Sequence, residues 1–254
     1  MEQKRDTISR MRAITISREY GSGGGEVAHR LAQHLGWQLV DHEIVVRVAS
    51  ELGVSEQEVE AQDEYAESIT SRIISSLQAM QPAMFAISAP FPDTPTIESY
   101  QEALDRVVQG AVATGHVVIV GRGAQVLLGD RRDVLHARVV APLEQRITYV
   151  MSREGVNRDD ARNRIQIKDQ DRMRYLQTVH HQRPDDAHLY DITLSTSMLS
   201  LDEVVDLICR ALEHKAERLS VPTGELGPAA GLARYPGTPG DFHPPTNITE
   251  QSRQ

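Results

Sequence analysis

The chain has 254 residues, 40% of them apolar, and a formal net charge of −9, so it can bury one domain core but lacks the basic surplus of general nucleic-acid binders. Its single cysteine, Cys209, excludes an intrachain disulfide and a cysteine-built zinc site, and no apolar stretch approaches the ~20 residues of a membrane span. We therefore expect a cytoplasmic protein that binds neither nucleic acid nor membranes.

The first elements along the chain predict a β-α-β unit. A short β-rich run at 13–16 is followed by a glycine-rich turn at 21–25. Apolar residues then recur at helical spacing over 26–35, and Gly36 is placed to end that helix. A second short strand follows at 38–40. Strand, glycine turn, helix and strand in this order indicate a parallel sheet.

The next part of the chain is predicted to hold helices, a proline-rich connector and one buried strand. Residues 43–81 are mainly helical in pattern, whereas four prolines among apolar residues favour a loop at 82–95. A helix is expected from 97 to 114. The continuous apolar run at 116–120 is typical of a strand that is buried on both faces of a sheet.

The second half is predicted as a strand at 134–140, an arginine-rich helical region at 143–182, a strand at 191–195 and a closing helix at 201–212. The closing helix begins with a capping box, and its apolar period places Cys209 in the core. The elements together predict an α/β fold with a parallel sheet.

The C-terminal end has a different composition from the rest of the chain. Six of the twelve prolines lie between residues 221 and 254, where no apolar period is visible. We therefore expect a folded domain over 13–215 and a disordered tail over 216–254.

The glycine-rich turn is the clearest functional signal. Glycines let backbone N–H groups converge on an anion, and the N-terminus of the following helix adds a positive partial charge. The alternative is a tight strand-to-helix turn that needs only positive φ angles. Our prediction is that the backbone of the turn and of the first helical residues binds phosphate, and the residues concerned are Gly21, Ser22, Gly23, Gly24, Gly25 and Glu26.

The order of these segments resembles a known family. The strand at 14–16, the glycine-rich turn, the helix that follows it and the strand ending at Asp41 resemble the opening of bacterial cytidylate kinases. The run over 17–26 is similar to the cytidylate kinase-like branch of that family. The Gly-Arg-Gly turn at 121–123 and the stretches over 169–175 and 190–196 fit the same pattern, so that the resemblance covers roughly residues 13–212.

The resemblance implies a three-layer fold of the P-loop NTPase type, a parallel sheet flanked by helices. It implies a helical acceptor-binding insert at about 55–100 and an arginine-rich lid at about 153–183. It also implies ATP and Mg²⁺ as cofactors, and transfer of the ATP γ-phosphate to a pyrimidine monophosphate such as CMP or dCMP. The partners would then be small-molecule nucleotides.

The chain departs from the usual P-loop at the lysine that reaches the β- and γ-phosphates. Gly24 stands at the lysine position, and Glu26 stands where a hydroxyl helps to hold magnesium. The cytidylate kinase-like branch also lacks the lysine and often has an arginine beside it, but here that neighbour is Gly25. Arg18 is the nearest replacement and a candidate catalytic residue. Alternatively, Arg18 is structural and pairs with Glu19 or Glu26.

The arginine-rich region is a second source of positive charge. In monophosphate kinases a lid closes arginines over the transferring phosphoryl group, and Arg172 and Arg174 match that stretch best, as catalytic candidates. The alternative is a solvated helix face with i,i+4 ion pairs such as Asp160–Arg164 and Glu154–Arg158. Further lid candidates are Arg153, Arg164 and Lys168.

The acceptor side is predicted from two positions. Asp41 ends the second strand, at the carboxyl edge of the sheet where ligands bind in open α/β folds. The resemblance places Asp41 beside the acceptor nucleotide, where it could orient the acceptor during catalysis, and Arg122 at the acceptor's phosphate or base. As alternatives, Asp41 could cap the next helix and Arg122 could be an ordinary loop arginine. No metal ligands are predicted, and we expect His180, His181 and His188 on a lid or loop surface rather than around a metal.

The leading functional hypothesis is therefore a nucleoside monophosphate kinase. A nucleotide-binding regulatory or sensor protein of the same fold, with little or no turnover, is the alternative that the missing lysine favours. A kinase for another small acceptor is a third hypothesis.

Overall fold

The computed structural model describes residues 8–41 and 97–227. The predicted helical region at 43–81 and the proline-rich connector at 82–95 lie outside the described residues, and so does nearly all of the predicted acceptor-binding insert. The chain divides into two units, residues 1–219 and 220–254. Of the second unit the structure describes residues 220–227, with a short 3₁₀ turn at Thr223–Glu225. The prediction of a disordered tail over 216–254 stays a prediction.

The described residues form one sheet of five parallel strands in the order β2-β3-β1-β4-β5. The central strand β1 pairs with β3 on one side and β4 on the other, so that Ile16 lies between Val120 and Ala137. The predicted α/β fold with a parallel sheet is thereby confirmed. The strand bounds are Ala13–Arg18 for β1, Gln38–Val40 for β2, Val117–Val120 for β3, Val134–Val140 for β4 and Ile192–Ser195 for β5.

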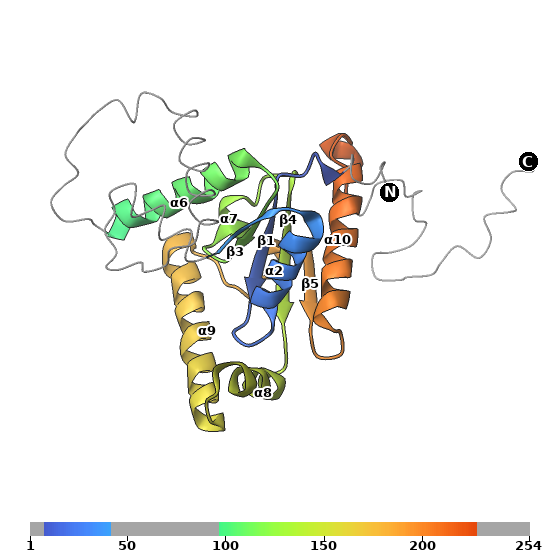
Figure 1. Cartoon of the computed structure of the whole chain (residues 1–254). Helices are drawn as coiled ribbons and strands as arrows, with labels where there is room; N and C mark the ends of the chain where they lie inside the picture. The colour runs from blue at the N-terminus through green and yellow to red at the C-terminus, as the bar shows by residue number, and fades with distance from the viewer. Residues whose placement is uncertain (1–7, 42–96, 228–254) are drawn as a thin grey trace, which may run out of the picture. The chain divides into compact units, whose positions relative to one another are not determined.

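Helices cover both faces of the sheet and complete three layers (Figure 1). On one face α2 (Gly24–Leu35) and α10 (Leu201–Glu217) pack against side chains such as Ile14 and Ile16. On the other face α6 (Ile97–Thr114) and α7 (Ala124–Leu127) pack against the strand side chains that point to that side of the sheet. Because successive strand side chains alternate between faces, nearly continuous apolar strands supply both cores.

The arginine-rich region forms a helical hairpin rather than one helix. α8 (Leu143–Glu154) ends at Gly155, whose φ of 66° lies in the left-handed region, and α9 (Arg158–His180) begins after Asn157, whose side chain caps the Asp160 N–H. The hairpin therefore turns where a glycine C-cap and an asparagine N-cap meet. Figure 1 shows α8 beyond the end of β4 and α9 running back along the domain.

Other boundaries differ from the sequence expectations by a few residues. β1 continues to Arg18, and α2 begins at Gly24 rather than at residue 26. α10 extends to Glu217 rather than 212, with both bonds of the predicted capping box present between Ser200 and Glu203. The predicted core position of Cys209 is confirmed, and burial raises the pKa of its thiol to about 11. Within the described part of the chain, no helix is long and apolar enough to cross a membrane.

Candidate functional site

The glycine-rich turn joins the carboxyl end of β1 to the N-terminus of α2. Gly21 and Gly23 have φ angles of 80° and 78°, a conformation in which glycine avoids the strain of a Cβ. Gly23 is the N-cap and provides no side chain to the helix, whose first backbone bond runs from Val27 N–H to Gly23 O at 2.9 Å. The N–H groups of Gly24 and Gly25 therefore belong to the uncapped first turn, where an anion is favoured.

Buried hydroxyls hold this turn in place. The Ser22 hydroxyl donates to the carbonyl of Glu19 at 2.9 Å and lies 3.1 Å from that of Val139 on β4. The Thr196 hydroxyl, just after β5, donates to the carbonyl of Ser22 at 3.0 Å. The Ser22 N–H also donates to Glu19, at 3.3 Å. Of the predicted phosphate-binding residues, Ser22 therefore uses its donors to hold the turn.

Arg18 passes beneath the glycine turn. A Cβ at Gly24 would lie 2.6 Å from the Cβ of Arg18, and a Cβ at Gly121 would lie 2.2 Å from Arg18 Nη1. The stem of Arg18 thus occupies the space beside Gly24, and its guanidinium lies against the turn that follows β3. A longer residue at position 24, such as the usual lysine, would collide with this stem.

Arg18, Arg122 and Arg172 form what we call the arginine cluster. Burial first, and then repulsion from Arg172 and Arg122, lower the pKa of Arg18 to about 9, whereas the carboxylate of Asp41 opposes this shift. Burial also lowers the pKa of Arg172, and attraction to Asp169 opposes that shift. Three further predicted site residues, Arg122, Arg172 and Asp41, are therefore near enough to Arg18 to act on it electrostatically.

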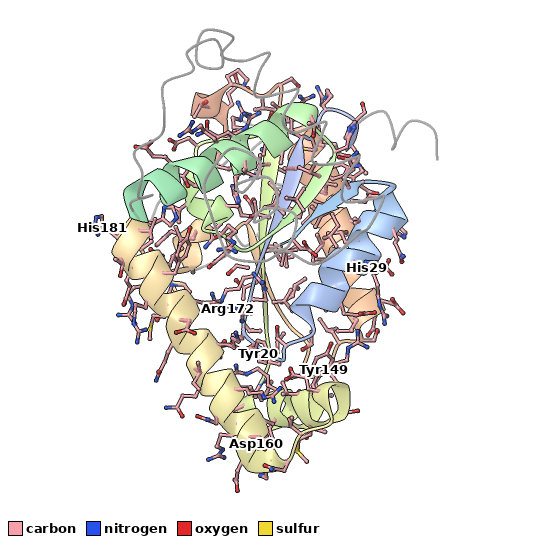
Figure 2. The ribbon with its side chains drawn as sticks, turned by 60° about the vertical axis from the view of Figure 1, so that its left-hand side comes forward. Tyr20, His29, Tyr149, Asp160, Arg172 and His181 are labelled. Atoms are coloured by element: carbon pink, nitrogen blue, oxygen red, sulfur yellow. The ribbon has the colours of Figure 1, made fainter. Side chains whose placement is uncertain are left out.

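Helix α9 is tied to the glycine turn by Asp169. One carboxylate oxygen accepts the Tyr20 N–H at 2.8 Å, and the other lies 2.5 Å from Nη1 of Arg146. The same Arg146 nitrogen donates to the Tyr20 carbonyl at 3.2 Å. One turn along α9, Arg172 lies over the Tyr20 ring at 5.4 Å, and its Nη1 is 3.4 Å from the carbonyl of Arg18. Figure 2 shows Arg172 beside Tyr20, midway along α9.

The remaining predicted lid cations have carboxylate partners elsewhere. Arg174 lies 3.7 Å from Asp171, and 74% of its side chain is exposed. Arg164 pairs with Glu154 at 2.7 Å, and Lys168 is near enough to help lower the pKa of that carboxyl. The structure therefore brings Arg172 to the arginine cluster and leaves Arg174, Arg164 and Lys168 in other contacts.

Two predicted ion-pair arrangements are wrong in detail. The structure pairs Arg164 with Glu154 rather than with Asp160, and it pairs Arg158 with Glu144 of α8. The predicted pairs assumed i,i+4 partners within one helix. The turn at Gly155 instead brings α8 against α9, so that carboxylates of α8 pair with arginines of α9.

Glu19 and Glu26 have partners other than Arg18, although a purely structural role for Arg18 predicted an ion pair with one of them. Glu19 accepts the Ala141 N–H at 3.1 Å and lies 3.7 Å from Arg146. Glu26 pairs with Arg30 at 3.0 Å and with Arg153 at 3.5 Å. This accounts for the predicted lid residue Arg153, and it leaves Arg18 beside the other two arginines of its cluster.

A second group of polar residues lies next to the arginine cluster and was missed from the sequence. Asp105 comes from α6, while Tyr175 and His180 come from α9; we call this set the α6–α9 polar cluster. The His180 ring lies 5.7 Å from that of Tyr175, edge to face, and its Nε2 would be 2.2 Å from a Cβ at Gly123. His180 therefore lies half-buried at the end of α9, where its ring packs against the turn after β3.

Burial dominates the electrostatics of the α6–α9 polar cluster. It raises the pKa of Asp105 and of Tyr175, and it lowers the pKa of His180. Arg122 lies close enough to Tyr175 to oppose the shift there. No signal in the sequence joins these residues, because Asp105 is far from the other two along the chain and each is unremarkable in its own helix.

Among residues 8–41 and 97–227, no group of three or more histidine, cysteine, aspartate or glutamate side chains could hold a metal ion. A magnesium ion commonly takes one or two carboxylates together with substrate phosphate oxygens and water. Asp41, beside Arg18, is a carboxylate of that kind at the carboxyl edge of the sheet. Glu26, in the first turn of α2, pairs with Arg30 and Arg153.

Comparison with known proteins shows which family this chain resembles. The model of the cytidylate kinase-like family matches residues 13–198. A cytidylate kinase of Methanopyrus kandleri is 28% identical over 214 residues, which cover 81% of this chain and 95% of that protein. A cytidylate kinase of Pyrococcus horikoshii is 26% identical and covers 84% and 92%. The crystal structure of an uncharacterized protein from Eubacterium ventriosum is 25% identical, covers 80% of this chain and 99% of that one, and superposes with a TM-score of 0.59.

Proposed function

Because the chain belongs to the cytidylate kinase-like family, we propose that it transfers the γ-phosphoryl group of ATP to a pyrimidine monophosphate such as CMP or dCMP. The observation that supports this most is the arginine cluster. Arg18 lies against Gly24 at the start of α2, Arg172 of α9 comes within 3.4 Å of the Arg18 carbonyl, and Arg122, from the turn after β3, is near enough to act on Arg18 electrostatically. Folding alone does not favour cations held so close together, whereas a phosphoryl group in transfer needs them.

Each part of the site has a distinct role in this proposal. The first-turn N–H groups of α2 bind the phosphates of ATP, and Arg18 supplies the charge that a lysine at position 24 supplies elsewhere. Arg172 stabilises the charge that develops on the transferring group. Arg122 and Asp41 hold the acceptor, with its phosphate on the arginine side.

Magnesium would be held by phosphate oxygens together with the carboxylate of Asp41, and it would neutralise phosphate charge. Little covalent chemistry is required of the protein, since positioning and electrostatics dominate such transfers. The protein's own task is therefore to bring two anionic nucleotides together.

A coupled ADP-release assay with purified protein, ATP, Mg²⁺ and a panel of nucleoside monophosphates tests the proposal. We expect turnover with CMP or dCMP, and a loss of about 100-fold in kcat/KM for Arg18→Met and for Arg172→Met. Arg162→Met is the matched control, because Arg162 also lies on α9 but pairs with Glu144 at an exposed position. Full CMP-dependent turnover by Arg18→Met would contradict the role of Arg18.

A nucleotide-binding sensor or regulatory protein of the same fold is the second candidate, and Gly24 in the place of the lysine favours it. The same assay separates the two candidates. Measurable ATP binding by calorimetry, with no ADP release for any monophosphate, would support the sensor and contradict the kinase.

A further inference from the structure

The α6–α9 polar cluster contains three buried polar atoms that lack hydrogen-bond partners among the described residues: Asp105 Oδ1, Tyr175 Oη and His180 Nε2. A buried polar group without a partner costs about 1–3 kcal/mol, so native proteins contain few of them. Three such atoms on two adjoining helices therefore indicate that a bound ligand supplies their hydrogen-bond partners.

The position of the cluster indicates which partner this is. His180 lies against Gly123, next in the chain to Arg122 of the arginine cluster. Arg122 is near enough to both Arg18 and Tyr175 to act on them electrostatically. The arginine cluster suits the phosphates, so a group attached to a phosphate and extending past Arg122 would reach the unpartnered atoms.

We infer that Asp105, Tyr175 and His180 recognise the base of the acceptor nucleotide. This inference rests on the proposed kinase function. Asp105 accepts a hydrogen bond from an exocyclic amine, and the Tyr175 hydroxyl and the His180 Nε2–H donate to a ring nitrogen and a carbonyl oxygen.

The chemistry of the three groups favours cytosine. An ionised aspartate only accepts hydrogen bonds, a phenol can donate, and a neutral histidine donates from one ring nitrogen. The pairing edge of cytosine carries one amine donor and two acceptors, which this set complements. A phosphate would be repelled by Asp105, and uracil has an oxygen where cytosine has its amine, which would leave the buried carboxylate unpaired.

The first test compares selectivity between CMP and UMP. In Asp105→Asn we expect KM for CMP to rise by about tenfold or more, and the CMP-to-UMP ratio of kcat/KM to fall by a similar factor. KM for ATP should stay within about twofold, because ATP does not meet this cluster. Glu102→Gln is the matched control, since Glu102 lies on α6 one turn away with a side chain 74% exposed.

The second test uses stability, which does not depend on turnover. Because the Tyr175 hydroxyl has no partner among the described residues, Tyr175→Phe should raise the Tm of the ligand-free protein and reduce the rise in Tm that CMP produces. A structural hydroxyl would give the opposite result, with a lower Tm and an unchanged response to CMP.

The outcomes distinguish failure of this inference from failure of the proposed kinase function. If the wild-type protein turns over CMP while Asp105→Asn keeps its KM and its CMP-to-UMP ratio, base recognition by this cluster is wrong and the kinase stands. If the wild-type protein releases no ADP with any monophosphate, the proposed function fails and the inference fails with it.

Discussion

Arg18 shows how single residues in this protein depend on distant glycines. Its stem needs the absence of a Cβ at Gly24, and its guanidinium needs the absence of one at Gly121. Proximity to the glycine turn was enough to make Arg18 a candidate from the sequence. Its contact with the turn after β3 was beyond prediction, because Gly121 is about 100 residues away and joins Arg18 only when β1 pairs with β3.

The buried cation at Arg18 predicts a conflict between stability and activity. Replacing it with methionine removes a desolvated charge beside two other arginines while keeping much of the stem's packing. We therefore expect Arg18→Met to raise the free energy of unfolding by about 1–2 kcal/mol, measured by urea unfolding, while phosphate binding weakens. A lower stability for this variant would show that the guanidinium has a structural role.

The same reasoning explains what was missed in the α6–α9 polar cluster. The sequence predicts a helix at 97–114 without a role for Asp105, and it predicts His180 on a lid or loop surface. Their shared environment arises from the packing of α6 and α9 near the turn after β3, and no local pattern encodes that.

At the level of elements, the hairpin of α8 and α9 determines where Arg172 lies. Its inner face has a small apolar core of Ile147, Val150, Ala161 and Ile165, with Tyr20 of the glycine turn packed against it. Asp169 then joins α9 to the backbone of that turn. The position of Arg172 therefore depends on one carboxylate as much as on apolar contacts.

Loss of the Asp169 charge should loosen α9 and displace Arg172. We expect Asp169→Asn to lower the free energy of unfolding by about 1–3 kcal/mol, since Arg146 beside it is 11% exposed, and to lower kcat/KM by about tenfold. Asp171→Asn is the control, because Asp171 pairs with an exposed arginine on the same helix and should change neither quantity. Equal effects of the two substitutions would contradict the role given to Asp169.

Most elements could be predicted from local patterns. The five strands and the closing helix follow from apolar period, glycine stops and a serine N-cap, and their bounds differ from expectation by a few residues. The break at Gly155 was overlooked because 143–182 was treated as one helical region, although a glycine is a common helix stop and α9 beyond it has only a weak apolar pattern. Its ion pairs were therefore assigned within one helix, although two helices provide them.

On the scale of the whole domain, one buried histidine in the sheet makes the stability of the fold depend on pH. His136 on β4 is 5% exposed, and its Nδ1 lies 2.8 Å from the Thr15 hydroxyl. Burial first, and then Lys215 of α10, lower its pKa, while Asp191 before β5 and a hydrogen bond to the Leu128 backbone oppose the shift. The folded protein therefore disfavours the protonated imidazole.

This arrangement predicts lower stability in mild acid. A histidine whose pKa is lower in the folded state contributes its full stability above its unfolded pKa of about 6.5, and loses it as pH falls toward the folded value. Between pH 7.5 and 5 we expect the Tm of the wild-type protein to fall more than that of His136→Gln, measured by calorimetry. The difference corresponds to at most about 1.4 kcal/mol per pH unit. Parallel curves for the two proteins would exclude His136 as the titrating group.

The central position of β1 has a consequence for synthesis of the protein. Ala13 is translated before its neighbours across the sheet, Val117 and Val134. At roughly 5–20 residues per second, the strand waits on the order of 5–25 seconds without either partner. The nascent chain therefore carries an apolar strand and the unformed glycine turn together, and β4 must leave the ribosome before this end of the sheet can take shape.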